Sequence, residues 1–186
     1  MTATIFDSLF TRKVMKVISG FILGVCGWKV EGVLPIRAQK CVIIAVPHAT
    51  AWDLPVTVMS SFLLDLHIRW FGKDSLFKKP FTSLMLWLGG ISVNRHASEN
   101  VVTLAIHRIR DSKEPLQLVI APEGSRKEKL VWKTGFYYIA TGAKVPIMLA
   151  YINYQRKILD LGEIFYPTGN YDADMEKIRK YYKNKE

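Results

Sequence analysis

A histidine and an aspartate five positions apart are the first residues in the sequence that could do chemistry. His48 and Asp53 follow the apolar, β-branched run 41–46, which predicts a buried strand. In open α/β sheets, ligands bind at the carboxyl ends of strands. A carboxylate that accepts one imidazole N–H fixes the tautomer and leaves the other ring nitrogen free to take a proton. The pair is therefore a candidate general base with its orienting acid. It also fits a purely structural histidine at a helix start, with Asp53 as the helix N-cap.

Two arginines follow two further predicted strands. Arg95 comes after one short strand, and Arg126 comes after another, in a run that contains Glu123 and Gly124. The planar guanidinium suits bidentate binding of phosphate, and a glycine lets a ligand approach the backbone closely. If the strands are neighbours, these residues and the His48/Asp53 pair converge at one edge of the sheet. The alternative is a pair of surface arginines, one of them in a salt bridge with Glu123.

The elements that must position these residues alternate along the chain. We expect strands at 28–32, 41–46, 67–71, 91–93, 116–121, 145–153 and 157–162, and helices at 3–28 (one or two), 54–64, 81–88, 99–110, 133–142 and 172–183. The alternation predicts an α/β fold with a largely parallel or mixed central sheet flanked by helices. A length of 186 residues fits one such domain, which we place at 29–186 after an N-terminal segment at 1–28.

The N-terminal segment has apolar residues at helical spacing, with Arg12, Lys13 and Lys16 among them. This pattern predicts an amphipathic helix in the headgroup region of a membrane, with Phe6, Phe10 and Trp28 exposed. A helix packed on the domain's own core is the alternative. The charge-free stretches are too short to span a bilayer, and no secretory signal is evident. We therefore expect a peripheral protein on the cytoplasmic face of the inner membrane, without a transmembrane helix.

The formal net charge is +10, from 26 basic and 16 acidic residues. A positive balance favours an anionic partner, such as a membrane surface, a phosphorylated substrate, an acidic carrier protein or nucleic acid. Nucleic acid is disfavoured because the aromatic residues lie within apolar runs and do not alternate with basic ones. Cys26 and Cys41 predict buried free thiols in a reducing compartment. The histidines show no metal-ligand spacing, so we expect no metal.

Four blocks in the sequence resemble those of the glycerolipid acyltransferases of the 1-acylglycerol-3-phosphate (lysophospholipid) acyltransferase type. The first, His-x4-Asp, stands at 48–53, and the second, a glycine, an apolar stretch and an arginine, stands at 90–95. The third, Ala-Pro-Glu-Gly-Ser-Arg at 121–126, is similar to the family's Phe-Pro-Glu-Gly-Thr-Arg. The fourth is Val-Pro-Ile at 145–147, and a Lys-Thr-Gly stretch before a helix precedes it. All four stand in the family's order.

The resemblance implies an enzyme with residues in named roles. His48 would be the base and Asp53 would orient it, while the phosphate end of the acceptor would be bound by Arg95, Glu123, Gly124, Ser125 and Arg126. The acyl group would pass from acyl-CoA or acyl carrier protein to the free hydroxyl of a lysophospholipid. The acceptor of the family's type reaction is 1-acylglycerol 3-phosphate, which gives phosphatidic acid. No cofactor is implied beyond the acyl donor.

Departures from the family pattern leave the acceptor open. Asn94 replaces a common aspartate, Ala121 an aromatic residue and Ser125 a threonine. Another lysophospholipid, a lyso-aminolipid or glycerol 3-phosphate is therefore an alternative acceptor. A non-enzymatic alternative is a peripheral protein that binds anionic lipid and keeps a vestigial site. The presence of both His48 and Asp53 argues against that alternative.

Overall fold

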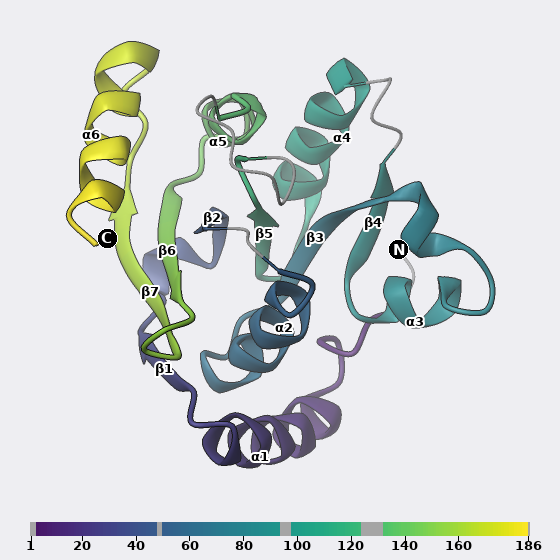
Figure 1. The fold of residues 1–186 in the computed structure, drawn as a ribbon. Coiled ribbons are helices and arrows are strands. Elements are labelled where there is room, and N and C mark those ends of the chain that lie inside the picture. The colour runs from purple at the N-terminus through teal and green to yellow at the C-terminus, as the bar shows by residue number, and fades with distance from the viewer. Residues whose placement is uncertain (1–2, 48–49, 94–97, 124–131, 186) are drawn as a thin grey trace.

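Within residues 3–47, 50–93, 98–123 and 132–185, which the computed structural model describes, seven strands form one sheet (Figure 1). Their order across the sheet is β1-β7-β6-β2-β5-β3-β4. The strands are β1 (Lys29–Gly32), β2 (Lys40–Val46), β3 (Ile68–Lys73), β4 (Gly90–Val93), β5 (Leu116–Ile120), β6 (Ile147–Asn153) and β7 (Ile158–Phe165). From β6 to β4 the strands are parallel, whereas β7 is antiparallel to β6 and pairs with β1 at the edge. The predicted α/β fold with a mixed sheet is confirmed.

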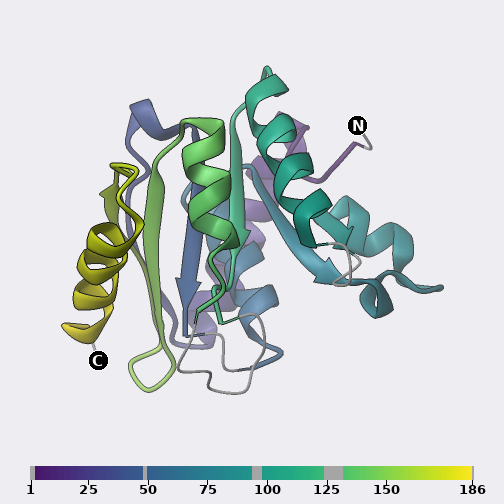
Figure 2. The same cartoon turned by 90° about the horizontal axis from the view of Figure 1, so that it is seen from above.

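Helices cover both faces of the sheet (Figures 1 and 2). The helices are α1 (Leu9–Val25), α2 (Asp53–Leu63), α3 (Thr82–Trp87), α4 (Ser98–Asp111), α5 (Gly135–Ala143) and α6 (Tyr171–Lys183), with short 3-10 turns η1 (Ile36–Ala38) and η2 (Asp74–Phe77). Val42 and Ile44 of β2 join the core under α4, α5 and α6. Cys41 and Ile43 join the core under α1, α2 and α3. Successive strand residues point to opposite faces, so a strand covered on both sides must be apolar throughout, as the run 41–46 is.

The segment before α1 belongs to the core. Phe6 is 0% exposed and stacks on Phe62 of α2, with ring centroids 5.0 Å apart, and the Ile5 N–H donates to the Trp87 carbonyl at 2.9 Å. The prediction that Phe6 is exposed is therefore wrong, because this residue precedes the helix and fills the space beneath α2. The prediction for Phe10, which is 78% exposed, is confirmed.

Helix α1 packs on α2. It buries only Ser19 and Leu23 among its own residues and leaves a broad apolar surface exposed. Cys26, at its C-terminal end, is exposed, so the prediction of two buried thiols holds only for Cys41. Burial raises the pKa of Cys41 to about 12. No helix in the described part of the chain is long and apolar enough to cross a bilayer.

Two polar contacts hold α1 against the segment that joins α2 to β3. Lys16 pairs with Asp65 at 2.8 Å, and Arg12 Nη1 lies 2.7 Å from His67 Nε2. A guanidinium has no acceptor, so Arg12 donates and His67 must accept as a neutral imidazole. Burial lowers the pKa of His67 below its ordinary value of 6.5, and the charge of Arg12 acts in the same direction. Arg69 also lowers this pKa, whereas the charges of Asp7 and Glu114 raise it.

This contact predicts a stability that depends on pH. The unfolded chain takes up a proton on His67 near pH 6.5, before the folded protein does, because the folded pKa is lower. The contribution of the contact to the free energy of unfolding is therefore complete above pH 6.5 and is lost as the pH falls through the lowered pKa. Urea unfolding between pH 8 and pH 5 should show this loss in the wild type and less of it in His67→Gln. The substitution His107→Gln, on an exposed residue of α4, should leave the wild-type pH dependence unchanged; if it removes as much of that dependence as His67→Gln does, the assignment to His67 is wrong.

Candidate active site

The strands that precede the first and third sequence blocks are direct neighbours. β2 pairs in parallel with β5, with Ile44 opposite Ile120, and with β6, with Val46 opposite Tyr151. β4, which forms the first four residues of the second block, runs parallel to them and is separated from β5 by β3. Because these strands are parallel, their carboxyl ends lie at one edge of the sheet. The first and third blocks follow their strands from that edge.

Two of the predicted site residues, Asp53 and Glu123, lie in the described part of the chain. The others, His48, Arg95, Gly124, Ser125 and Arg126, lie outside the described residues, so their predicted roles stay predictions. Among the described residues, no group of three or more His, Cys, Asp and Glu side chains is placed to hold a metal ion.

Asp53 is a buried carboxylate that accepts hydrogen bonds from neighbouring donors. It is the first residue of α2, is 5% exposed, and follows Trp52 as the helix N-cap, so the prediction of Asp53 as N-cap is wrong by one position. The Thr50 backbone N–H donates to Oδ2 at 3.1 Å. The Thr50 hydroxyl lies 3.3 Å from Oδ1 and 3.1 Å from the Tyr154 oxygen, and its single proton serves one of the two. These contacts connect the first residue of α2 to Thr50, which lies between β2 and α2.

Tyr154 reaches Asp53 from a distant part of the chain. It directly follows β6, and its hydroxyl donates a hydrogen bond to Asp53 Oδ1. Its ring meets the ring of Trp28 edge to face, with centroids 5.3 Å apart and planes at 89°. The prediction that Trp28 is exposed is wrong, because its side chain is half-buried against this ring. Burial raises the pKa of Tyr154 to about 12, and the hydrogen bond to Asp53 acts in the same direction. Tyr154 is therefore a neutral donor throughout the physiological pH range.

Thr50 and Tyr154 were not among the residues predicted from sequence. Thr50 lies inside the first block, but its hydroxyl and N–H have no distinctive spacing. Tyr154 carried a usable signal, because it directly follows the predicted strand 145–153. The rule that drew attention to His48, that polar residues after a parallel strand lie at the ligand-binding edge, applies to Tyr154 as well.

Glu123 lies in the turn after β5. It follows Pro122, which is buried and whose carbonyl accepts the Lys133 N–H at 2.8 Å. Burial raises the pKa of Tyr182 in α6 well above its ordinary value, and the charges of Tyr181 and Glu123 act in the same direction. Glu123 is therefore within electrostatic reach of α6.

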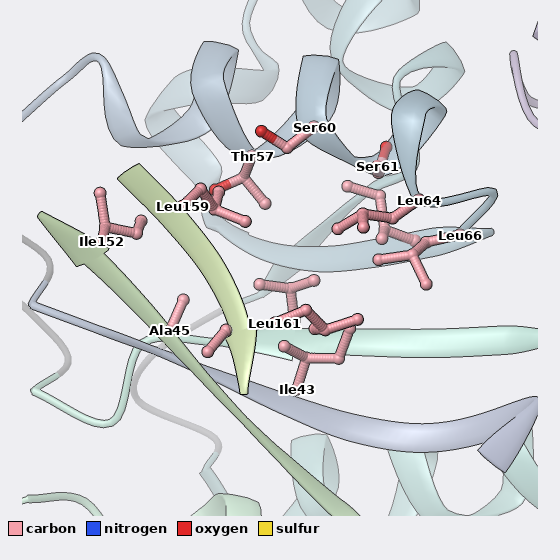
Figure 3. Close-up of a pocket in the computed structure, with 13 residues that line it drawn as sticks. Ile43, Ala45, Thr57, Ser60, Ser61, Leu64, Leu66, Ile152, Leu159 and Leu161 are labelled. Atoms are coloured by element: carbon pink, nitrogen blue, oxygen red, sulfur yellow. The ribbon is translucent and has the colours of Figure 1, made fainter. Parts of the chain in front are cut away.

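An apolar cavity lies between α2 and the sheet (Figure 3). It has an empty volume of about 360 Å³, part of which is open to solvent. Ala45 of β2, Ile152 of β6 and Leu159 of β7 line its floor, and Thr57 lies on the helix side. Ala45 and Ile152 each precede a polar block or residue of the candidate site by a few positions, so the cavity adjoins the edge at which Asp53 lies.

Comparison with known proteins gives the class of the protein. Residues 27–153 match a family profile described as Acyltransferase, and this match covers more than half of the chain. The chain belongs to this acyltransferase family, and it is an enzyme of that class. The predicted family and enzyme class are confirmed.

The fold is also similar to a solved structure. That structure is the 1-acyl-sn-glycerophosphate (LPA) acyltransferase PlsC from Thermotoga maritima, with a TM-score of 0.64. The alignment covers 94% of this chain and 78% of that one at 16% sequence identity, so the likeness concerns the fold. No curated protein matches the sequence significantly.

The contacts of Asp53 predict the effect of an isosteric change. Asp53→Asn leaves one acceptor oxygen where the structure uses two, so the side chain can no longer serve both Thr50 N–H and the Tyr154 hydroxyl. If Asp53 orients a general base, kcat for acyl transfer should fall by about 10²-fold or more. Steady-state kinetics on a variant whose circular dichroism matches the wild type measures this. Asp172→Asn, on the exposed surface of α6, should retain wild-type kcat. A folded Asp53→Asn variant with wild-type kcat would contradict the role.

Proposed function

We propose that the enzyme transfers a fatty acyl group from acyl-CoA or acyl carrier protein to the free hydroxyl of a lysophospholipid. The acceptor we favour is 1-acylglycerol 3-phosphate, with phosphatidic acid as product, in phospholipid biosynthesis. The proposal rests on one observation above all: the aspartate of the His-x4-Asp block is buried and hydrogen-bonded at the carboxyl edge of β2, in a chain of the acyltransferase family. The solved structure of similar fold is described as acting on LPA, which supports this acceptor. Other lysophospholipids, lyso-aminolipids and glycerol 3-phosphate are the alternative acceptors.

The proposed reaction is a direct transfer. His48, oriented by Asp53, takes the proton of the acceptor hydroxyl while the oxygen attacks the thioester carbonyl. The tetrahedral oxyanion then collapses and the C–S bond breaks. The departing thiolate takes the proton from His48 and is released as the thiol. Arg95, Glu123, Gly124, Ser125 and Arg126 bind the phosphate end of the acceptor. Cys41 is unsuited to an acyl-enzyme step, because its buried thiol with a pKa of about 12 yields almost no thiolate near neutral pH.

The cavity beneath α2 supports a hydrocarbon substrate. Its described lining is almost entirely apolar, apart from hydroxyl groups of α2, and contains no charged side chain. Such a space disfavours a charged or sugar-like group and favours an alkyl chain by transfer from water. Its position beside the strand ends allows an acyl chain to enter while its carbonyl stays at the polar edge.

An acyl-transfer assay tests the function. Purified protein should release thiol from acyl-CoA or acyl carrier protein in the presence of one of four acceptors: lysophosphatidic acid, another lysophospholipid, a lyso-aminolipid or glycerol 3-phosphate. We expect the highest kcat/KM with lysophosphatidic acid, and a loss of at least about 10²-fold in His48→Ala. Mass spectrometry of the lipid product identifies the acylated hydroxyl. Equal thiol release by the wild type and His48→Ala on every acceptor would refute the proposal.

We further propose that α1 lies in the interface of an anionic membrane, which places the enzyme peripherally on the cytoplasmic face of the inner membrane. The outer face of α1 exposes large apolar side chains from end to end: Leu9, Phe10, Val14, Val17, Ile18, Phe21, Ile22 and Val25. Arg12 and Lys16 face the domain, where they contact His67 and Asp65, whereas Lys13 is exposed. An apolar helix face of this extent, on a protein of formal net charge +10, suits the interfacial region of an anionic bilayer.

Substitutions on that face test the membrane contact better than a truncation does, because Leu23 and the residues before α1 are part of the core. Phe10→Asp, Val17→Asp and Phe21→Asp combined change three side chains that are each more than 70% exposed. Partition to vesicles of phosphatidylglycerol and phosphatidylcholine should fall by at least about tenfold, since each apolar side chain contributes up to ~1.5–3 kcal/mol when buried. Leu104→Asp, in α4 on the opposite side of the sheet, is the matched control. Unchanged co-sedimentation of the folded triple variant would refute the contact.

A further inference from the structure

We propose that Tyr154 is a positioning residue for acyl transfer, whose hydroxyl holds the Asp53 carboxylate in the orientation that His48 requires. The inference rests on the proposed function, because it acts through the roles of Asp53 and His48. It adds a residue that lies outside the four sequence blocks.

The geometry places Tyr154 as the tertiary anchor of Asp53. The contacts from Thr50 come from the same turn as Asp53, so they can move together with it. Tyr154 is 101 residues further along the chain and is carried by β6, which pairs with β2 in a register that sets Tyr151 opposite Val46. Its hydrogen bond therefore fixes the Asp53 carboxylate relative to the sheet, from which the first block departs.

The tyrosine ring is itself held in place by apolar contacts. It packs against the buried cluster formed by Val56 of α2, Ile152 of β6 and Leu159 of β7, and it meets the Trp28 ring edge to face. Phenylalanine would preserve these contacts, so packing alone does not require the hydroxyl. The hydroxyl of this half-buried side chain has lost part of its contact with water, and Asp53 and Thr50 lie within hydrogen-bond distance of it.

The hydrogen bond also has an electrostatic effect. The charge that acts on the Tyr154 hydroxyl in the described structure is that of Asp53, and burial keeps the phenol protonated, with a pKa raised to about 12. A donor to Oδ1 withdraws negative charge from the carboxylate. Removing the donor strengthens the field of Asp53 at a neighbouring imidazole, which favours imidazolium and raises the pKa of the base. Loss of the hydroxyl should therefore raise the pKa of the base, whereas a loss of packing alone should not.

Tyr154→Phe tests the inference, with Tyr166→Phe on the exposed surface as the matched control. We expect kcat about tenfold lower, the magnitude of one hydrogen bond to a charged group, with KM for the acceptor unchanged within about twofold. The acidic limb of the kcat/KM profile should move to higher pH in Tyr154→Phe and stay in place in Tyr166→Phe. A non-additive effect of Tyr154→Phe and Asp53→Asn on the free energy of unfolding would support the contact independently of activity.

The outcomes separate this inference from the proposed function. An active wild type with unaltered kcat and pH profile in Tyr154→Phe overturns the inference alone. A lowered kcat with an unmoved acidic limb reduces Tyr154 to a structural residue and also overturns it. A wild type that releases no thiol with any acceptor overturns the proposed function, and the positioning role with it, whatever the unfolding measurements give.

Discussion

The parallel pairing of β2 with β5 on one side and β6 on the other is the constraint on which the site depends. β2 is covered by helices on both faces and by strands on both edges, so its backbone and side chains are fixed at once. Its last residue, Val46, is separated from the first sequence block by Pro47 alone. β5 and β6 run parallel to β2, so the third block and Tyr154 follow strands that end at the same edge of the sheet. The strand at the centre of the core thus also positions the candidate site.

A buried carboxylate, Asp53, lies at the edge of the sheet where β2 ends. Asp53 has lost most of its contact with water, which is unfavourable for an ionised group unless donors replace the water. Among the described residues, the backbone and hydroxyl of Thr50 and the phenol of Tyr154 lie within hydrogen-bond distance of the carboxylate. An ionised group surrounded by fixed dipoles need not reorganise when a neighbouring imidazole gains a proton, which is the form of preorganisation that acid–base chemistry uses. The arrangement also explains why a threonine inside the first block and a tyrosine outside all blocks belong to one site.

Helix α1 faces two environments. Its inner side makes polar contacts, Arg12 to His67 and Lys16 to Asp65, and packs on α2 with Ser19 and Leu23 buried. Its outer side is apolar and exposed. Lysine and arginine in such a helix are expected to border the apolar face and meet headgroups. Here two of the three basic residues contact the rest of the chain, so in the proposed membrane contact Lys13 and the positive net charge of the chain supply the attraction to an anionic surface.

The sequence by itself determined the class of fold, the order of its elements and the family. These follow from local patterns: apolar runs of strand length, helical periodicities, and four short blocks in a fixed order. It also identified Asp53 and Glu123 as residues at strand ends. The tertiary structure decided that β5 and β6, which are far apart in the chain, flank β2, that Phe6 is core while Phe10 is surface, and that Cys26 is exposed. It alone joined Tyr154 to Asp53, because a hydrogen bond between residues 101 positions apart depends on strand order and register. The types of the two bonded residues give no information about that strand order or that register.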